Sequence, residues 1–333
     1  MQNDTSAPTS APLTEPPARF EVGVLLPTGA AQWGDGTDPR ALIPFALRAE
    51  ELGFDSLFVN DSLLTPRIEP LTMLAALAAV THRATLGTGA LLPFLRRPVQ
   101  AAQTLASVDL LSGGRLAVAV GAGFPGRFGQ PLYELSELPW ERRFKRLDET
   151  VDLWRRLWST TGPTSFHGEL LHFDDIPPST QPFTPGGPPV WLGGATPAAL
   201  ARTGRRYDGW LPYPPDPADY RTGLAVVREA ATTAGRDAAG LTPALFVSVL
   251  VDEVPAAARR SMDAYAQATY GMPLAQLETI QAVLTGPADE VAAGLSRYVQ
   301  AGARHLVIRL GGLTLKTQQE QLERIAELVT RLQ

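Results

Sequence analysis

Three short segments of this chain carry residue types that bind a charged ligand or move a proton. Asn60-Asp61-Ser62 places a carboxylate and a hydroxyl directly after an apolar run, and a carboxylate can act as a general acid or base. Gly193-Gly194-Ala195-Thr196 offers backbone N–H groups of the kind that bind phosphate. Arg309 is able to bind an anionic cofactor tail or substrate, or else to form an ion pair within the fold. We therefore expect a small-molecule partner.

The segment from Trp191 to Pro197 is the stronger of the candidate ligand sites. An apolar strand runs into Gly193 and Gly194, and Thr196 can cap a helix that begins at Pro197. Several free N–H groups and a hydroxyl then point at one spot, with the positive end of the helix behind them. This arrangement predicts a phosphate site. The alternative is ordinary helix capping without a ligand.

Residues 121–126 match the pattern G-x-G-x-x-G after a strand, which could indicate a dinucleotide fold. That fold needs a helix directly on the glycines. Here Pro125, Gly129 and Pro131 predict irregular chain until about Pro139. In a barrel, Gly121-Ala122-Gly123 would instead let a flat ring approach the backbone, unless it is a plain tight turn.

The elements that position these residues are clearest in residues 84–123, which read as strand, helix and strand. The runs 85–92 and 115–120 are apolar, as strands buried on both faces should be. Pro98 opens the helix between them, and Ser112-Gly113-Gly114 ends it. Its apolar positions recur at helical spacing: Val99, Ala102, Ala106 and Leu110. Parallel strands need such a crossover, and barrels bind ligands at the carboxyl ends of their strands, here 87–90 and 121–124.

Eight such strands alternate with helices, which predicts an α/β fold, a (β/α)8 TIM barrel with insertion loops at the C-terminal face. The predicted strands are 20–26, 55–60, 84–92, 115–121, 189–193, 208–212, 244–251 and 305–310. In the first helix Asp38 is the expected cap and Gly53 the end, and the expected inner face is Leu42, Phe45, Ala49 and Leu52. In the fourth helix the residues interpreted as core are Phe144, Leu147, Val151, Trp154 and Trp158.

Two segments do not fit a minimal barrel. Residues 124–139 and 159–188 are full of Pro, Gly and aromatic residues. Long loops of this kind are lids or substrate walls, or else loops that merely cover a barrel end. The sequence SFHGELLHF within the second segment predicts a small hairpin.

Composition limits the possible partners and setting. The chain has 333 residues, 44% of them hydrophobic, a net charge of −5 and no cysteine. We expect a disordered extension over 1–19, without a signal peptide, and a single barrel domain over 20–333. Scattered basic residues predict no nucleic acid and no membrane partner, and the absence of cysteine excludes disulfides and thiolate chemistry. A cytoplasmic location fits.

The four histidines predict no metal site. His167 and His172 lie five residues apart across the expected hairpin, and no third ligand is in view. His305 starts the eighth strand at the bottom of the barrel, where a structural role is expected.

Over residues 20–330, motifs follow one another in an order that resembles the bacterial luciferase-like family of flavin- or deazaflavin-dependent oxidoreductases. The motifs are L-G-T-G ending in Leu92-Pro93, R-P-V, L-A-S-V-D-L-L-S-G-G-R-L, R-L-D-E at 146–149, P-V-W-L-G-G at 189–194 and Y-D-G-W at 207–210.

The resemblance implies a role for each candidate segment. Residues 193–196 would bind the phosphate end of the flavin, and Asp61, with Asn60, would lie near its ring. The strand ends Thr88-Gly89-Ala90 and Gly121-Ala122-Gly123 would also border the cofactor. A cis peptide bond between Gly89 and Ala90, and a homodimer, are implied as well.

Two positions depart from the family pattern. Ser62 stands where many members have a histidine, and a serine is no unaided acid or base at neutral pH. The proton step must then be absent, move to Asp61 or another residue, or be left to water. Ala122 stands where some flavin members have a phosphate-binding arginine, which weakens the flavin interpretation.

The resemblance favours a monooxygenase that acts on a small organic substrate with oxygen and reduced FMN, and a separate flavin reductase would supply the reduced FMN. The alternative is hydride transfer by an 8-hydroxy-5-deazaflavin coenzyme. A second alternative is a non-catalytic flavin-binding protein of the same fold. A weaker one is a barrel enzyme of unrelated chemistry that binds a phosphate.

Overall fold

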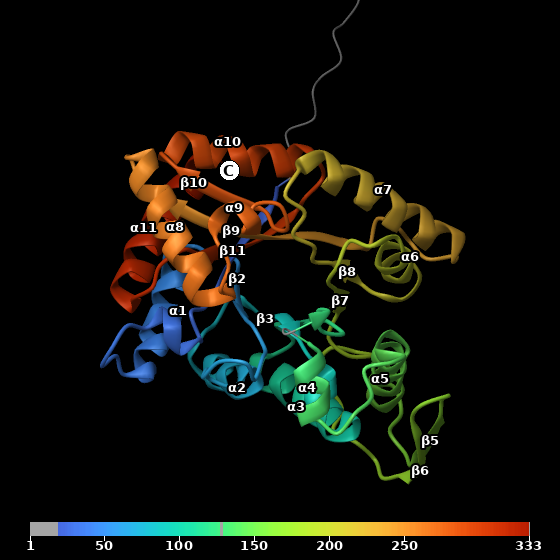
Figure 1. The fold of residues 1–333 in the computed structure, drawn as a ribbon. Coiled ribbons are helices and arrows are strands. Elements are labelled where there is room, and N and C mark those ends of the chain that lie inside the picture. Colours follow the sequence, from blue (N-terminus) through green and yellow to red (C-terminus); the bar gives the residue numbers. More distant parts are fainter. Residues whose placement is uncertain (1–18, 127–128, 333) are drawn as a thin grey trace, which may run out of the picture.

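The computed structural model describes residues 19–126 and 129–332, and its centre is a closed parallel barrel (Figure 1). Its strands are β1 (Glu21–Leu25), β2 (Ser56–Val59), β3 (Thr85–Leu91), β4 (Leu116–Val120), β7 (Val190–Leu192), β8 (Gly209–Trp210), β9 (Thr242–Val251) and β11 (His305–Leu310). They pair in the order β9-β11-β1-β2-β3-β4-β7-β8, and β8 pairs with β9 to close the ring. The eight predicted strands are confirmed, with small differences at their ends.

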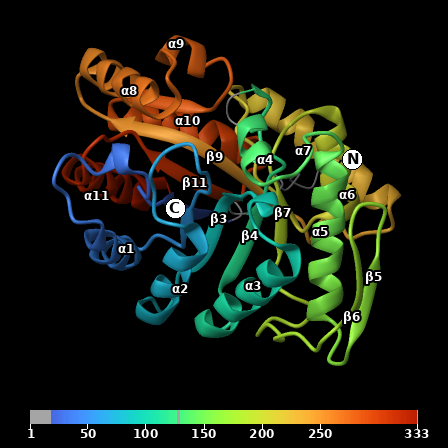
Figure 2. The same cartoon turned by 60° about the horizontal axis from the view of Figure 1, so that its bottom comes forward.

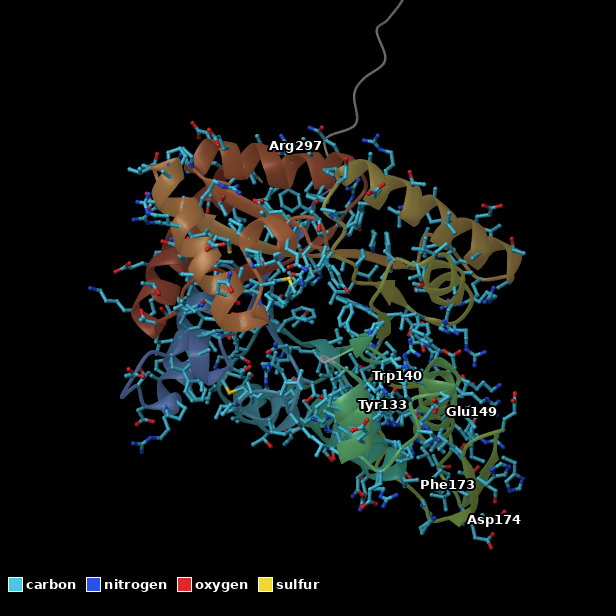
Figure 3. All side chains as sticks on the ribbon, viewed as in Figure 1. Tyr133, Trp140, Glu149, Phe173, Asp174 and Arg297 are labelled. Carbon is cyan, nitrogen blue, oxygen red and sulfur yellow. The ribbon has the colours of Figure 1, made fainter. Side chains whose placement is uncertain are left out.

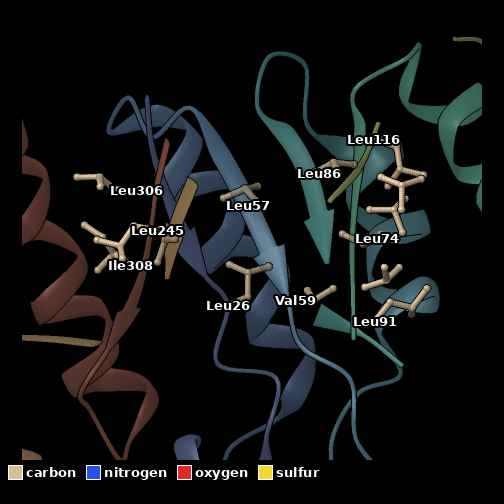
Figure 4. Packing of buried hydrophobic residues seen from close by; sticks show 14 of the residues in the cluster. Leu26, Leu57, Val59, Leu74, Leu86, Leu91, Leu116, Leu245, Leu306 and Ile308 are labelled. Atoms are coloured by element: carbon tan, nitrogen blue, oxygen red, sulfur yellow. The ribbon is translucent and has the colours of Figure 1, made fainter. Parts of the chain in front are cut away.

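Side chains of the barrel strands alternate between the interior and the surrounding helices. On β11, Val307 packs inside with Phe58 and Trp191, whereas Leu306 and Ile308 pack in the outer layer (Figure 4). The interior holds these large rings because facing positions are small. A Cβ on Gly87 would lie 2.4 Å from the ring of Phe58. The barrel is therefore filled by side chains.

Helices surround the barrel (Figure 2). They are α1 (Leu42–Glu51), α2 (Pro70–Val80), α3 (Pro98–Ser112), α5 (Arg143–Trp158), α6 (Pro197–Arg206), α7 (Pro217–Thr233), α10 (Ala288–Gln300) and α11 (Leu315–Leu332). The described residues also form short 3-10 turns, namely η1 (Ala30–Gln32), η2 (Pro39–Ala41) and η3 (Pro93–Leu95). Asp38 accepts a hydrogen bond from the N–H of Arg40, which confirms the predicted cap.

Two residues assigned from helical spacing lie elsewhere. Leu110 is 45% exposed, because α3 turns its neighbour Asp109 inward to accept the N–H of Thr184. Phe144 is 37% exposed and lies under the guanidinium groups of Arg143 and Arg202 instead of in the core. The prediction of core positions was wrong for Phe144, and Leu110 does not extend the buried face of α3.

The first insertion, residues 124–139, follows β4 at the C-terminal end of the barrel. It was expected to be irregular, but it contains α4 (Gln130–Leu135). Pro131 is compatible with this helix because it lies in the first turn, where a missing N–H costs nothing. Tyr133 of α4 is buried between Phe94 and Trp140, which fixes the insertion to the barrel rim (Figure 3).

The second insertion, residues 159–188, begins at the opposite end of the barrel and is no lid over the C-terminal face. The reason is direction: α5 runs back from the C-terminal end, and Arg155 near its end pairs with Asp208 before β8. The predicted hairpin is confirmed as β5 (Thr164–His167) and β6 (His172–Ile176). It lies along α5, where Glu149 accepts the N–H groups of residues 169–171 (Figure 3).

A third insertion escaped the sequence analysis. Between β9 and α10 the chain forms α8 (Pro255–Tyr270), α9 (Leu274–Leu277) and β10 (Val283–Gly286). β10 pairs with the far end of β9, beyond the part that pairs with β8. This segment therefore covers the C-terminal end of the barrel beside β9 and β11.

The predicted disordered extension, residues 1–19, lies outside the described residues apart from Arg19. Among the helices that the structure describes, none has the length and apolar character needed to cross a membrane.

Candidate active site

The carboxyl end of β3 forms one wall of the barrel mouth, which is the opening surrounded by the carboxyl ends of the barrel strands. The pairing of β3 with β4 shifts between Thr88 and Leu91, so that the strand bulges at Gly89 and Ala90. The peptide bond between these two residues is cis, as the resemblance implied. A Cβ on Gly89 would lie 3.4 Å from Leu25 of the barrel interior. The bulge thus rests on the interior side chains and turns bare backbone toward the mouth.

The carboxyl end of β4 lies next to this bulge. The N–H of Gly121 donates to the carbonyl of Leu91, and Gly123 has a φ of +75° that favours glycine. Ala122 is buried, and its carbonyl accepts the Tyr133 hydroxyl at 3.1 Å. Gly121, where the resemblance predicts a cofactor contact, therefore lies beside Ala90 of the bulge, whereas Gly123 lies against Phe94.

Thr88 belongs to the same strand end, but its side chain has a different task. Its hydroxyl is fully buried and donates to the carbonyl of Ala119 at 2.7 Å. Only the backbone of Thr88 is left to border the mouth.

Asp61 follows β2 and is held by an ion pair. Its Oδ2 lies 2.5 Å from Nη1 of Arg96 and accepts the N–H of Leu92 at 3.0 Å. The second Nη of Arg96 pairs with Glu69 at the start of α2. Neither bond uses Oδ1 of Asp61. The carboxylate is buried and oriented, with one oxygen outside these bonds.

The two polar neighbours of Asp61 make local hydrogen bonds. Asn60 accepts the hydroxyl of Thr28 at 3.2 Å, which ties the loop after β2 to the loop after β1. Ser62 accepts the N–H of Leu64 at 3.1 Å. Among the described residues no base contacts the hydroxyl of Ser62, so the side chain has no partner that would activate it.

Residues 193–196 have the predicted form, a strand end followed by a capped helix. Thr196 accepts the N–H of Ala199 at 3.3 Å and caps α6. Trp210 donates to the carbonyl of Gly194 at 2.8 Å. In the described part of the chain the N–H groups of Gly194, Ala195 and Thr196 donate to no protein acceptor. This cradle of backbone donors suits a phosphate.

Arg309 points into the mouth from the carboxyl end of β11. The side chain is only 6% exposed and donates to the hydroxyl of Tyr270. Its guanidinium carbon lies 5.2 Å from the ring of Tyr270 and 5.3 Å from that of Phe246. No carboxylate of the described residues pairs with it, so the expected alternative of an ion pair within the barrel is not found.

Arg67 is a second arginine in this part of the mouth. It lies on the loop after β2, where the loop pairs with Gly29 of the loop after β1. Burial lowers the pKa of Arg67, and the charge of Arg309 lowers it further. Sequence analysis missed Arg67 and Tyr270 because neither lies in a motif. It missed Arg96 because the adjacent R-P-V motif was interpreted only as a helix start.

The histidines lie away from this mouth. His305, at the bottom of the barrel, is buried with Nε2 2.7 Å from the Ser56 hydroxyl and Nδ1 2.7 Å from Glu21. His167 lies 2.7 Å from Asp174 on the hairpin. Within the described ranges no three His, Cys, Asp or Glu side chains gather as metal ligands.

Comparisons with known proteins agree with the fold and with the motif order. A family model described as luciferase-like monooxygenase matches residues 20–305. The F420-dependent glucose-6-phosphate dehydrogenase of Segniliparus rotundus is 29% identical over 304 residues, 83% of this chain and 89% of that protein. The same-named protein of Amycolatopsis mediterranei is 35% identical over 185 residues, 52% of this chain, and that match spans about half (53%) of the relative.

Among solved structures, an F420-dependent secondary alcohol dehydrogenase in complex with an F420-acetone adduct superposes with a TM-score of 0.81. The alignment covers 95% of this chain and 99% of that one at 20% identity. At this identity the likeness shows the fold, an eight-stranded parallel barrel of the kind described above.

Proposed function

This chain belongs to the luciferase-like monooxygenase family, and from that membership we propose that it is an F420-dependent oxidoreductase. The proposed reaction is hydride transfer between the deazaflavin and a small alcohol or carbonyl substrate. The observation that carries the proposal is the match over most of both chains to a relative named for F420. This match favours hydride transfer by a deazaflavin coenzyme over the reduced-FMN monooxygenase that the sequence analysis placed first.

The residues of the mouth fit such a cofactor. The strand ends at Gly89 and Ala90 and at the glycines after β4 carry no large side chain, so a flat ring would lie against their backbone. The two strand ends are neighbours, since a Cβ at Gly121 would lie 3.7 Å from Leu92 and 3.8 Å from Ala90. The unpaired N–H groups of Gly194 and Ala195 would hold the phosphate. When bound, the deazaflavin supplies a carrier that accepts or donates a hydride.

Asp61 is the residue we assign to the proton that accompanies the hydride. Arg96 and the N–H of Leu92 fix its Oδ2, which leaves Oδ1 to accept a proton from a substrate hydroxyl. Ser62 would at most orient the substrate, because no base contacts its hydroxyl among the described residues. In this assignment Asp61 performs the proton transfer, so the reaction needs no histidine at position 62.

The implied homodimer remains a proposal. Leu110 and Leu111 on α3 are exposed apolar side chains at adjacent positions, as expected for a face that another copy covers. Light scattering of the purified protein tests this point.

The function is tested by turnover with and without oxygen. The purified protein is mixed with oxidised F420 and a panel of secondary alcohols and sugar phosphates, and loss of the oxidised F420 absorbance is followed. We expect reduction of F420 at equal rates in anaerobic and air-saturated buffer. Oxygen-dependent product formation with reduced FMN, and none with F420, would contradict the proposal and support the monooxygenase.

A further inference from the structure

We propose that Arg67 and Arg309 form a binding site for an oxyanion, a carboxylate or phosphate group of the substrate. The inference rests on the proposed function only in assigning this group to a substrate. The site itself is argued from the unbalanced charge, the buried donors and the position of the two side chains in the mouth.

The strand pattern directs Arg309 into the mouth. On β11 His305 contacts the interior ring of Trp191 and Val307 packs in the interior cluster, so Arg309 is the next inward position. In the sheet it lies beside Leu25 of β1 and Ser248 of β9. Arg309 thus forms part of the uppermost interior layer, directly below any ligand in the mouth.

Buried donors without acceptors gather here. Nε of Arg309, Nε of Arg67 and the hydroxyl of Ser248 are all buried and make no hydrogen bond within the described structure. Buried polar groups are normally satisfied, and an unsatisfied one is costly. All three groups can donate, so the ligand that completes them must be an acceptor.

The charges of the mouth favour an anion as that acceptor. The charged groups that we assign to the mouth are three guanidinium groups, Arg67, Arg96 and Arg309, and two carboxylates, Asp61 and Glu69. Arg96 forms ion pairs with both carboxylates. No described carboxylate pairs with Arg67 or Arg309, and their mutual repulsion is one reason why the pKa of Arg67 is lowered. An oxyanion between them would balance the excess charge.

Tyr270 and Tyr265 keep Arg309 in place without neutralising it. The Tyr270 hydroxyl accepts a hydrogen bond from Arg309, and the guanidinium carbon of Arg309 lies 6.0 Å from the ring centroid of Tyr265. Both tyrosines come from α8, which belongs to the insertion between β9 and α10. The insertion therefore supplies one wall of the proposed anion site.

The position separates this site from the cofactor phosphate. The cradle at Gly194 and Ala195 follows β7, whereas Arg309 ends β11. Two strands, β8 and β9, lie between them on one side of the barrel and four on the other. One phosphate cannot contact both, so a cofactor anion at β7 and a substrate anion at β11 would occupy separate positions.

The test is an anion titration of the full-length protein saturated with F420, which leaves the β7 cradle occupied. Thermal midpoints are measured against inorganic phosphate and against acetate, with sodium chloride at matched ionic strength as the reference. The variants are Arg309→Gln, Arg309→Lys and Arg67→Gln. The matched control is Arg260→Gln, an exposed arginine on α8. Stronger stabilisation by phosphate or by acetate identifies which oxyanion the site takes.

We expect the wild type and the control to be stabilised, and Arg309→Gln and Arg67→Gln to bind the anion at least about tenfold more weakly. Arg309→Lys should bind the anion more tightly than Arg309→Gln because it keeps the positive charge. It should bind more weakly than the wild type because a lysine lacks the paired N–H donors of the guanidinium. If Arg309→Gln does not fold, Arg67→Gln on its loop answers the same question. F420 affinity should be unchanged in all variants.

Unchanged anion affinity in Arg67→Gln and in a folded Arg309 variant would overturn the inference while leaving F420 binding intact. A loss of F420 affinity in these variants would also overturn it, since the arginines would then hold the cofactor tail. If F420 does not bind, the titration is made on the apoprotein. Arginine-dependent anion binding there would support the site while the proposed function fails.

Discussion

Arg96 orients Asp61 at the mouth of the barrel, with Nη1 of the guanidinium 2.5 Å from Oδ2 of the carboxylate. The same oxygen accepts the N–H of Leu92, so both contacts fix one face of the carboxylate and leave Oδ1 outside them. A carboxylate held in this way has one defined oxygen to offer to a substrate hydroxyl.

Replacement of Asp61 should remove the proton acceptor and spare the cofactor. For Asp61→Asn we expect kcat to fall by roughly 10²–10⁴, the usual contribution of a general acid or base. The F420 dissociation constant should stay within about twofold of the wild-type value, a change worth only a few tenths of a kcal/mol. Steady-state kinetics and fluorescence titration measure the two quantities.

The matched control for Asp61 is Glu69→Gln, which removes the other carboxylate on Arg96. Its kcat should change little, because Asp61 keeps its contact with Arg96. Wild-type turnover in Asp61→Asn would assign the proton step to another group or to water.

Glu149 should make stability depend on pH. Burial raises the pKa of this carboxylate, but the N–H bonds from residues 169–171 outweigh it, and the net pKa lies below the usual range. A group with a lowered folded pKa stabilises the protein above its unfolded pKa, and this contribution is lost as the pH falls through the folded pKa. Glu149→Gln should thus cost about 1–3 kcal/mol near neutral pH and progressively less in acid.

Urea unfolding of wild type and Glu149→Gln, at about pH 7 and about pH 3, measures this difference. Glu229→Gln on α7 is the control, since Glu229 is exposed and makes no hydrogen bond in the described structure. A constant difference between wild type and Glu149→Gln at both pH values would contradict the role of the charge.

Gly87 should be intolerant of a side chain, because a Cβ there would lie 2.4 Å from the ring of Phe58 inside the barrel. Gly87→Ala is expected to lower the free energy of unfolding by about 1–3 kcal/mol through overpacking. Gly162→Ala is the control, since a Cβ at Gly162 meets nothing within 4 Å. Equal unfolding midpoints for both variants would refute the packing argument.

A negative charge in the N–H cradle before α6 should weaken cofactor binding. Ala195 is exposed between the unpaired N–H groups, so Ala195→Asp would place a carboxylate where the phosphate is expected. We expect at least about tenfold weaker F420 binding, or 1.4 kcal/mol. Ala225→Asp, an exposed site on α7, should bind F420 as the wild type does. Equal F420 affinities in Ala195→Asp and Ala225→Asp would contradict the assignment of the cradle as the phosphate site.

Much of the barrel was predictable because its strands are short apolar runs between helices with clear starts and stops. Asp38, Pro98 and Thr196 marked helix ends correctly, since capping is a local property. The expectations for Leu110 and Phe144 failed because helical spacing does not show which of two adjacent faces of a helix other segments cover. The segment with α8, α9 and β10 was missed because it reads like an ordinary crossover helix.

Sequence analysis singled out glycines, the carboxylate of Asp61 and Arg309 because they follow or end predicted strands. The structure places Asp61, Gly89 and Gly193 at such strand ends, but the N–H of Gly193 donates to the carbonyl of Val120 and does not belong to the cradle. Arg67 and Arg309 are 242 residues apart in the sequence, and only the closed sheet, in which β1 pairs with both β2 and β11, brings them to one side of the mouth. No local sequence pattern predicts that these two arginines share one side of the mouth.

The most direct test of the account is a fluorescence titration of the purified apoprotein with F420 and with FMN, each oxidised and reduced. We predict that F420 binds with a dissociation constant on the order of micromolar and that FMN binds at least about tenfold more weakly. Tight binding of FMN without binding of F420 would contradict the account and return the monooxygenase as the better interpretation.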